Sequence, residues 1–286
     1  MTMAGDKIDL TVETAWCPGC GNHIILAAVK DVLNDLGKKP HEVLIVGGIG
    51  QAPKLPQYLR VNGFCGLHGR AVPPAVAAKI ANRDLTVIVN TGDGDSYGEG
   101  GNHFIHNIRR NVDITHFVHD NQIYGLTKGQ ASPTSELGHV TEVQPDGSRN
   151  RPLNPILLAI ALGCGFAARA FAGDPQQLKE IMAAGIRYKG YALIDILQPC
   201  VSFNKLNTYQ WYRDRVHPVG SDYDPKNKML AMQTAMEWGE HIPTGILYYE
   251  GKPDFHDGID FLRNGPPLVD AAVDLEMIRG FMDAFR

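Results

Sequence analysis

The alternation of short apolar runs with helical segments is the feature of this sequence that most limits its possible folds. The runs at 43–46, 85–89 and 114–118 are rich in β-branched and aromatic residues and alternate only weakly, as do strands covered on both faces of a parallel sheet. Stretches with the apolar spacing of amphipathic helices flank them, at 21–36, 71–82 and 100–111. The pattern predicts an α/β fold, a doubly wound and mostly parallel sheet with helices on both faces.

The alternation resumes after a long Ser/Thr/Pro/Gly-rich loop at 131–152, and loops of this kind inside compact domains are usually functional or mobile. The elements expected next are a helix at 155–163, a strand at 165–171, a helix at 174–190 with Asp174 as its N-cap, and a strand at 191–197. After residue 200 the sequence becomes rich in Tyr, Trp and Pro, with one more helix near 227–240. We therefore expect an α/β domain at 1–215 and a C-terminal extension at 216–286 that packs on this domain or on a partner.

Composition excludes several classes of protein. The 27 Lys and Arg residues against 31 Asp and Glu, with a formal net charge of -4, argue against a nucleic-acid-binding surface. The longest apolar stretch, 156–168, is shorter than the roughly 20 residues of a membrane span. The first ten residues lack the apolar core of a secretory signal, so we expect a cytoplasmic protein. Five cysteines then suggest metal ligands, catalytic thiols or buried small side chains rather than a disulfide framework.

A glycine-rich acidic turn follows one predicted strand, and an asparagine follows the next. Gly92 and Gly94 let backbone N–H groups approach an anion, and the helix that follows adds its N-terminal dipole. Because Asp93 and Asp95 would repel a bare phosphate, we expect a cation between carboxylate and phosphate, and Mg²⁺ prefers such oxygen ligands. Asn121 comes 28 residues after Asp93, which fits one crossover and brings both groups to the same edge of the sheet.

The turn, the helix and the asparagine together resemble the thiamine diphosphate motif. Five blocks extend the resemblance over about residues 12–215: WCPGCGNH, GIGQAPKLP, GLHGRA, GDGDSYGEGGNH and HDNQIYGLTKGQASPT. They are similar to the β subunit of the 2-oxoacid:ferredoxin oxidoreductases. The resemblance implies that Mg²⁺ is bound by Asp93, Asn121 and the backbone carbonyl of Ile123. These three residues and the following would contact thiamine diphosphate: His68, Gly92, Gly94, Asp95, Gly125, Leu126 and Thr127. The domain at 1–215 would then bind both thiamine diphosphate and an iron–sulfur cluster.

Cys17 and Cys20 form a CPGC pair directly before a predicted helix. The spacing alone suits a zinc site, a redox dithiol or an iron–sulfur cluster. The family resemblance implies a [4Fe-4S] cluster, held by this pair and two distant cysteines, of which Cys200 matches the last. The family commonly has its remaining cysteine directly after GIG, where this sequence has Gln51. We expect Cys65 to replace it; a cluster held by three cysteines, with a labile iron, is the alternative.

The remaining cysteine and several histidines have simpler interpretations. Cys164 lies in the apolar stretch ALGCGFAA and is expected to be a buried small side chain. His106, His116 and His119 are expected to be structural. His68, in the block GLHGRA, is placed near the thiamine by the resemblance, where it could donate to a diphosphate oxygen or simply bond to backbone.

Two lysines are candidates for binding the substrate. A 2-oxoacid carries a carboxylate that must be oriented before it leaves as CO2, so cations are required near the thiamine. Lys54 follows the GIG block and Lys128 follows the predicted magnesium ligands. We therefore assign them, with His68, as candidate catalytic residues, although either lysine could instead be solvated or paired with a carboxylate.

The resemblance implies one overall reaction. A 2-oxoacid, with pyruvate or 2-oxoglutarate favoured, reacts with coenzyme A and oxidised ferredoxin to give acyl-CoA, CO2 and reduced ferredoxin. The glutamate that activates thiamine belongs in this family to an α-type partner subunit, so this chain is expected to need that partner for catalysis. Two alternatives stay open: one half of a thiamine-dependent decarboxylase or acetolactate-synthase-like enzyme without electron transfer, and a zinc-stabilised nucleotide-binding subunit without catalysis.

Overall fold

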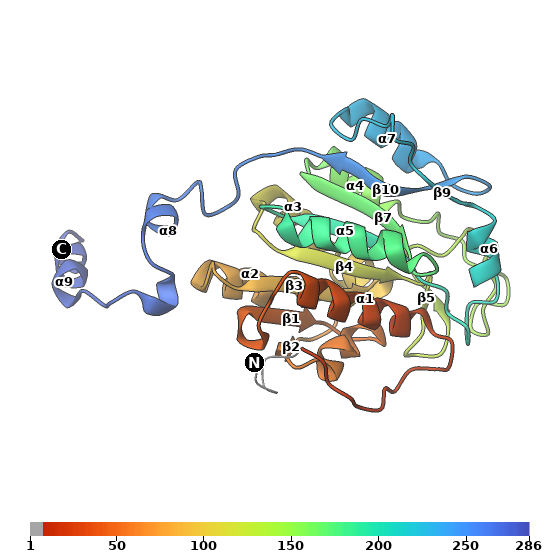
Figure 1. Cartoon of the computed structure of the whole chain (residues 1–286), viewed down its shortest axis with the longest axis horizontal. Coiled ribbons are helices and arrows are strands. Elements are labelled where there is room, and N and C mark those ends of the chain that lie inside the picture. Colours follow the sequence, from red (N-terminus) through yellow and green to blue (C-terminus); the bar gives the residue numbers. More distant parts are fainter. Residues whose placement is uncertain (1–7, 286) are drawn as a thin grey trace.

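The computed structural model describes residues 8–285. Residues 1–7, on which part of the argument against a secretory signal rests, lie outside the described residues. The core is an eight-stranded sheet of order β2-β1-β3-β4-β8-β7-β10-β9 (Figure 1). Its strands are β2 (Asn62–Cys65), β1 (Val43–Gly47), β3 (Thr86–Gly92), β4 (Thr115–Asp120), β8 (Ala192–Leu197), β7 (Phe166–Phe171), β10 (Ile242–Tyr249) and β9 (Val216–Pro218). The first six are parallel, and β10 pairs antiparallel with β7. The predicted fold class is confirmed.

Helices cover both faces of this sheet, as the alternation predicts. One face carries α1 (Gly21–Asp35) and α5 (Pro175–Arg187), which pack side by side (Figure 1). The other carries α2 (Val72–Ala81), α3 (Gly101–Arg110), α4 (Pro155–Ala161) and α7 (Lys228–Met236). The side chain of Asp174 accepts a hydrogen bond from the Gln177 amide and thereby caps α5, as expected.

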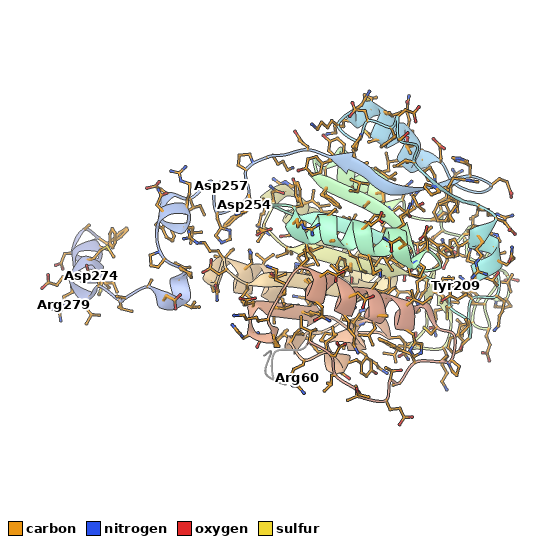
Figure 2. The ribbon with its side chains drawn as sticks, viewed as in Figure 1. Arg60, Tyr209, Asp254, Asp257, Asp274 and Arg279 are labelled. Carbon is orange, nitrogen blue, oxygen red and sulfur yellow. The ribbon has the colours of Figure 1, made fainter. Side chains whose placement is uncertain are left out.

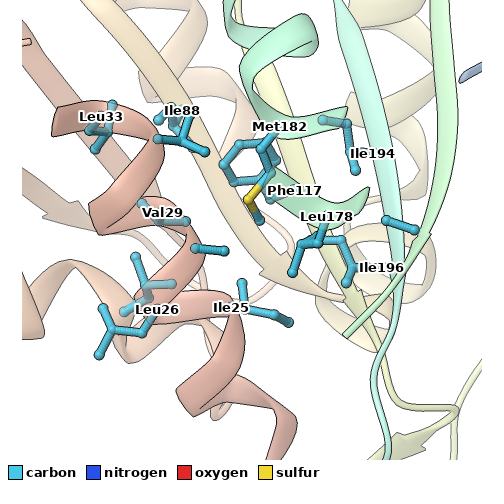
Figure 3. Close-up of a cluster of buried hydrophobic side chains, with 14 of the residues drawn as sticks. Ile25, Leu26, Val29, Leu33, Ile88, Phe117, Leu178, Met182, Ile194 and Ile196 are labelled. Carbon is cyan, nitrogen blue, oxygen red and sulfur yellow. The ribbon is translucent and has the colours of Figure 1, made fainter. Parts of the chain in front are cut away.

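Two apolar clusters lie on either side of the sheet. In Figure 3, Ile88, Phe117 and Ile194 of the central strands meet side chains of α1 and α5. Val87 and Val89, the neighbours of Ile88, belong to the opposite cluster. Because successive side chains of a strand point to opposite faces, this distribution is that of a strand covered on both sides. The large core fixes the ends of β3 and β4, from which the site is built.

For the segment after residue 200, the sequence predicted only one helix, near 227–240. This segment contains α6 (Tyr209–Arg213), β9, α7 and β10, and β10 completes the main sheet beside β7. Beyond β10 the chain leaves the body as an arm with α8 (Asp260–Asn264), η4 (Leu268–Asp270) and α9 (Leu275–Asp283) (Figure 1). Figure 2 shows Asp254 and Asp257 near the base of this arm and Asp274 and Arg279 toward its end.

Three short elements lie between the main strands. η1 (Pro40–Glu42) leads into β1, η2 (Ala52–Tyr58) follows it, and η3 (Gly94–Glu99) is a π-helix directly after β3. A small hairpin of β5 (Ile123–Tyr124) and β6 (Gln130–Ala131) follows β4. π-helical turns are rare and occur frequently at functional sites, so the segment after β3 is a natural place to look for one.

Candidate cofactor site

Asp93 stands at the point where β3 ends and the π-helix η3 begins, and its side chain is buried. Its Oδ2 accepts hydrogen bonds from the hydroxyls of Ser132, at 2.5 Å, and Thr134, at 2.7 Å. Burial raises the pKa of Asp93 to about 6, and the two hydroxyls oppose this rise. The carboxylate is therefore oriented by two donors but still lacks a compensating positive charge.

Asn121 follows β4 directly and comes to the same edge of the sheet, because β3 and β4 are neighbours paired through Gly92 and His119. Its side-chain oxygen accepts a hydrogen bond from the Ile123 amide at 3.0 Å, and its backbone carbonyl accepts one from Asn204 at 3.1 Å. An amide oxygen has two lone pairs, so the contact with Ile123 leaves one for another partner.

These groups line one pocket at the carboxyl ends of the strands. The lining residues are Ile49, Gly50, Gln51, Ala52, His68, Gly92, Asp93, Gly94, Asp95, Asn121, Ile123, Tyr124, Gly125, Leu126 and Thr127. All of the residues predicted to contact thiamine diphosphate are among them. A carboxylate, an amide oxygen and a backbone carbonyl are hard oxygen donors of the kind that Mg²⁺ takes beside a phosphate. The residues present therefore fit a magnesium-bound diphosphate.

The Asp95 side chain lines the pocket and is also hydrogen-bonded to two neighbouring loops. Its Oδ1 accepts from His68 Nδ1 at 2.6 Å and from the amides of Gly69 and Ile49 at 2.8 Å and 3.1 Å. The loop after β1 lies so close that a Cβ on Gly48 would stand 2.1 Å from Asp95 Oδ2. Asp95 thus holds the His68 loop and the loop after β1 together at the mouth of the pocket, and orients the His68 ring.

Lys54 and Lys128 border the pocket without lining it. Lys54 lies on η2, whose first residue, Ala52, is in the lining, and Lys128 follows Thr127 with a left-handed backbone (φ 75°). Their predicted role with the substrate stays a prediction. The structure adds Ser132 and Thr134, which contact Asp93 and were not predicted as site residues. Two signals for them were present in the sequence: they end the block HDNQIYGLTKGQASPT, and they lie in the Ser/Thr-rich 131–152 loop.

A second pocket lies beside the first and is lined by Trp16, Cys17, Cys20, Asn22, Gln51, Asn121, Gly125, Gln198, Cys200, Val201, Ser202 and Phe203. Three of the four predicted cluster ligands are here. Ser202 donates to the sulfur of Cys17 at 3.1 Å, and Gln198 Nε2 donates to that of Cys20 at 3.4 Å. The pKa of Cys20 is raised to about 11, mainly by burial; the nearby Cys200 and Cys17 contribute to the rise, and the Asn22 amide opposes it.

Cys65, the fourth predicted ligand, lies elsewhere. It ends the edge strand β2, is exposed, and has its Sγ 3.9 Å from the Pro53 carbonyl. It is not among the residues that line the cysteine pocket, so the structure does not bring it together with the other three. Cys164 is fully buried in the second apolar cluster, as expected.

The three cysteines fit a cluster better than a single ion. Within residues 8–285, no three His, Cys, Asp or Glu side chains are close enough together to bind one metal ion. In an iron–sulfur cluster each thiolate binds a different iron, so the ligands surround the cluster instead of converging on one point. Three thiols around one pocket match that arrangement, and all three are free of disulfides in the described part of the chain.

The two pockets share a wall. Gln51, Asn121 and Gly125 line both of them, so the oxygen donors of the first pocket and the thiols of the second belong to adjoining pockets. A cofactor that releases electrons in the first pocket would have the second directly beside it.

A third cavity is lined by Asp120, Gln122, Thr134, Asn154, Arg169, Asp195 and Trp238, among others, and its lining residue Thr134 contacts Asp93. Burial raises the pKa of Asp120 well above its usual range, and the nearby Asp195 and Asp93 add to the effect. Burial likewise raises the pKa of Asp195 to about 6, although Arg169 and the Tyr97 hydroxyl, 2.8 Å away, oppose it. The carboxyl of Asp93 is thus backed by two further buried acids.

Comparison with known proteins agrees with this geometry. Residues 48–196 match the family model described as thiamine pyrophosphate enzyme, C-terminal TPP binding domain. Residues 200–264 match the model for the C-terminal part of the pyruvate ferredoxin oxidoreductase beta subunit. The chain is 42% identical to the 2-oxoacid:ferredoxin oxidoreductase subunit beta of Saccharolobus solfataricus, over 94% of this chain and 96% of the relative. The chain belongs to the 2-oxoacid:ferredoxin oxidoreductase β-subunit family.

Two further relatives carry more specific names. The chain is 45% identical to the 2-oxoglutarate oxidoreductase subunit KorB of Mycobacterium tuberculosis. This match covers 67% of this chain and 52% of the relative. The solved structure of the 2-oxoglutarate:ferredoxin oxidoreductase from Magnetococcus marinus, with 2-oxoglutarate, coenzyme A and succinyl-CoA bound, superposes with a TM-score of 0.90 at 35% identity. That match covers 98% of this chain and 97% of the other.

The family membership defines the enzyme class. This chain is a subunit of an oxidoreductase that acts on 2-oxoacids, and its central part is a thiamine-pyrophosphate-binding domain. A β subunit implies further subunits. None of the helices within residues 8–285 has the length and apolar character needed to span a bilayer.

Proposed function

We propose that this β subunit, together with an α-type subunit, carries out the CoA-dependent oxidative decarboxylation of a 2-oxoacid and passes the electrons through a [4Fe-4S] cluster to ferredoxin. The observation that carries the proposal is the shared wall of Gln51, Asn121 and Gly125 between the oxygen-donor pocket and the cysteine pocket. When bound, thiamine diphosphate supplies the electron sink for decarboxylation, and the cluster supplies a one-electron acceptor.

The residues of the first pocket would hold the cofactor by its diphosphate. Ser132 and Thr134 both donate to Asp93 Oδ2, so we assign Oδ1 to the metal. Asn121 and the carbonyl of Ile123 supply the other protein ligands. His68, oriented by Asp95, can donate its second ring nitrogen to a phosphate oxygen when that nitrogen carries a proton.

In the second pocket, Cys17, Cys20 and Cys200 would bind the cluster as thiolates. Iron binding favours the deprotonated thiol and so overcomes the raised pKa of Cys20. The amide of Gln198 and the hydroxyl of Ser202 donate to two of the sulfurs and stabilise their negative charge. Such thiols need a reducing compartment, in agreement with the expected cytoplasmic location.

Among the substrates, the proposal favours 2-oxoglutarate over pyruvate. Both relatives named above for one substrate are 2-oxoglutarate enzymes, whereas pyruvate is named only by the family model for residues 200–264. A dicarboxylate needs a second cation, and the proposal keeps Lys54 and Lys128 as candidates, since both border the pocket. We further propose that residues 1–215 bind both cofactors and that residues 216–286, whose arm carries exposed apolar side chains, pack on the partner as well as on this domain.

The test is an anaerobic assay of the chain co-expressed with its α-type partner. We expect viologen reduction that requires 2-oxoglutarate, CoA and both subunits. Full-rate decarboxylation by this chain alone would contradict the division of labour between subunits. An iron-free, colourless complex that releases an aldehyde would instead indicate the non-oxidative thiamine enzyme, and zinc without stabilisation by thiamine diphosphate would indicate a scaffold subunit.

A further inference from the structure

The cysteine pocket supplies three thiols, and a [4Fe-4S] cluster has four irons that each need a ligand from the protein or solvent. The only other described cysteine close in sequence to the family's missing position is Cys65, which lies outside the pocket with its sulfur against the Pro53 carbonyl. The position directly after GIG, by contrast, does reach the pocket. The residue there is Gln51.

The backbone around Gln51 is held firmly in place. Trp16 Nε1, from the segment that carries Cys17, donates to the Gln51 carbonyl at 2.9 Å. This bond ties the loop after β1 to the cysteine pair. The position that carries a cysteine elsewhere in the family is therefore in place beside the other ligands, although its side chain differs.

The side-chain oxygen of Gln51 is buried and has no hydrogen-bond donor among the described residues. A buried acceptor without a partner is costly, so such an atom needs an explanation, and a bound ion or group is one of them. Gln198, in the same pocket, also has an unpartnered side-chain oxygen, but its amide nitrogen already donates to Cys20. Of these two glutamines, only Gln51 occupies the position directly after GIG, where the family commonly has a cysteine ligand.

We propose that Cys17, Cys20 and Cys200 are the only thiolate ligands of the cluster, and that the side-chain oxygen of Gln51 faces its fourth iron. The inference rests on the proposed presence of a [4Fe-4S] cluster. Gln51 also lines the first pocket, so the proposed ligand would stand at the boundary between the two pockets. A neutral amide oxygen binds iron more weakly than a thiolate does, so the fourth iron is exchangeable.

The chemistry that reveals such an iron is a one-electron oxidation. Ferricyanide takes one electron from [4Fe-4S]²⁺, the resulting [4Fe-4S]³⁺ releases Fe²⁺, and [3Fe-4S]⁺ remains. The product is paramagnetic, whereas the starting cluster is not. Iron analysis and electron paramagnetic resonance therefore read the reaction without any assay of turnover.

The experiment uses the anaerobically purified complex of this chain with its α-type partner. After one equivalent of ferricyanide per cluster, we expect the unchanged complex to lose about one iron in four and to show the [3Fe-4S]⁺ signal. The Gln51→Cys complex should keep its iron and stay silent, because a fourth thiolate now holds the iron. The Cys65→Ser complex should behave like the unchanged one.

Two outcomes would overturn the inference: loss of the cluster in Cys65→Ser, or equal iron release from Gln51→Cys and the unchanged complex. Thermal stabilisation by thiamine diphosphate with Mg²⁺ shows in each variant that the chain is folded. Failure of the proposed function is a different result, since the unchanged complex would then contain no iron before any oxidant is added.

Discussion

A single hydroxyl joins the buried carboxyl groups of Asp93 and Asp120: Thr134 Oγ1 lies 2.7 Å from Asp93 Oδ2 and 2.7 Å from Asp120 Oδ1. A hydroxyl has one proton and can donate to only one of the two. The two carboxyls therefore share one donor, and burial together with the nearby Asp195 and Asp93 raises the pKa of Asp120 well above its usual range.

Replacing Thr134 by valine should therefore destabilise the protein, because two buried carboxyls lose a shared partner. We expect a loss of about 1–3 kcal/mol in the free energy of unfolding. Thr134→Ser, which keeps the hydroxyl, should lose much less. Urea unfolding of the cofactor-free chain at neutral pH measures both, and equal stability of the valine variant and the unchanged chain would show that the bridge contributes nothing.

Asp93 is expected to be indispensable for cofactor binding. At about 100 times its Kd, thiamine diphosphate with Mg²⁺ should stabilise the unchanged chain by about 2.7 kcal/mol. Asp93→Asn should abolish this stabilisation, because the metal loses its only charged ligand from the protein. The matched control is Asp84→Asn, an exposed carboxylate outside the pocket, which should keep the full thermal shift. A full shift in Asp93→Asn would remove Asp93 from the metal site.

Gly48 should not tolerate a side chain, because an added Cβ would overlap Asp95 Oδ2. Gly48→Ala must displace Asp95 and with it the His68 ring, and we expect a loss of about 1–3 kcal/mol from overpacking together with weaker cofactor binding. At Gly251, a Cβ would meet nothing within 4 Å, so Gly251→Ala is the control. Thermal unfolding with and without the cofactor compares the two, and identical behaviour would mean that the Asp95 contact is not needed.

His116 should make the chain sensitive to acid. Burial lowers its pKa to about 3, whereas an unfolded histidine titrates near 6.5. Between these values the unfolded chain binds the extra proton, so the stability present above pH 6.5 falls as the pH decreases toward 3, by roughly 1.4 kcal/mol per pH unit.

The difference between His116→Asn and the unchanged chain isolates this contribution. Other groups also titrate in this range, but they are common to both proteins. The variant should lose less stability than the unchanged chain between pH 6 and 4, as measured by urea unfolding at each pH. His41→Asn, at an exposed position, should leave the slope as it is. Parallel slopes in all three proteins would rule out a neutral buried His116.

The sequence was sufficient to predict elements whose side chains enter the two apolar clusters. β1, β3, β4, β7 and β8 were all predicted, because both of their faces are buried and the residues are correspondingly apolar. β2 was missed: its residues, NGFC, are exposed at the edge of the sheet and have no pattern. β10 was missed because Pro243 and Gly245 interrupt its apolar residues, and the Tyr/Trp/Pro-rich segment before it gave no sign of an antiparallel partner.

The site was predictable where strand order determines it, as for Asp93 and Asn121 at neighbouring strand ends. It was not predictable where a loop folds back through space. Ser132 and Thr134 reach Asp93 from a segment without periodicity, and nothing local in the sequence indicates which hydroxyls of that segment are buried. The position of Cys65 was unpredictable for a similar reason, because its distance from the other cysteines depends on the register of an edge strand.

Gln51, Asn121 and Gly125 line both pockets, so under the proposed function the binding of thiamine diphosphate and the binding of the cluster should influence each other. If these residues adjust when one cofactor binds, the affinity for the other cofactor should change. Thermodynamic linkage makes this effect mutual. The affinity for thiamine diphosphate should therefore depend on whether the iron–sulfur cluster has been inserted. Insertion of the cluster and binding of thiamine diphosphate would then be coupled steps in the assembly of this subunit.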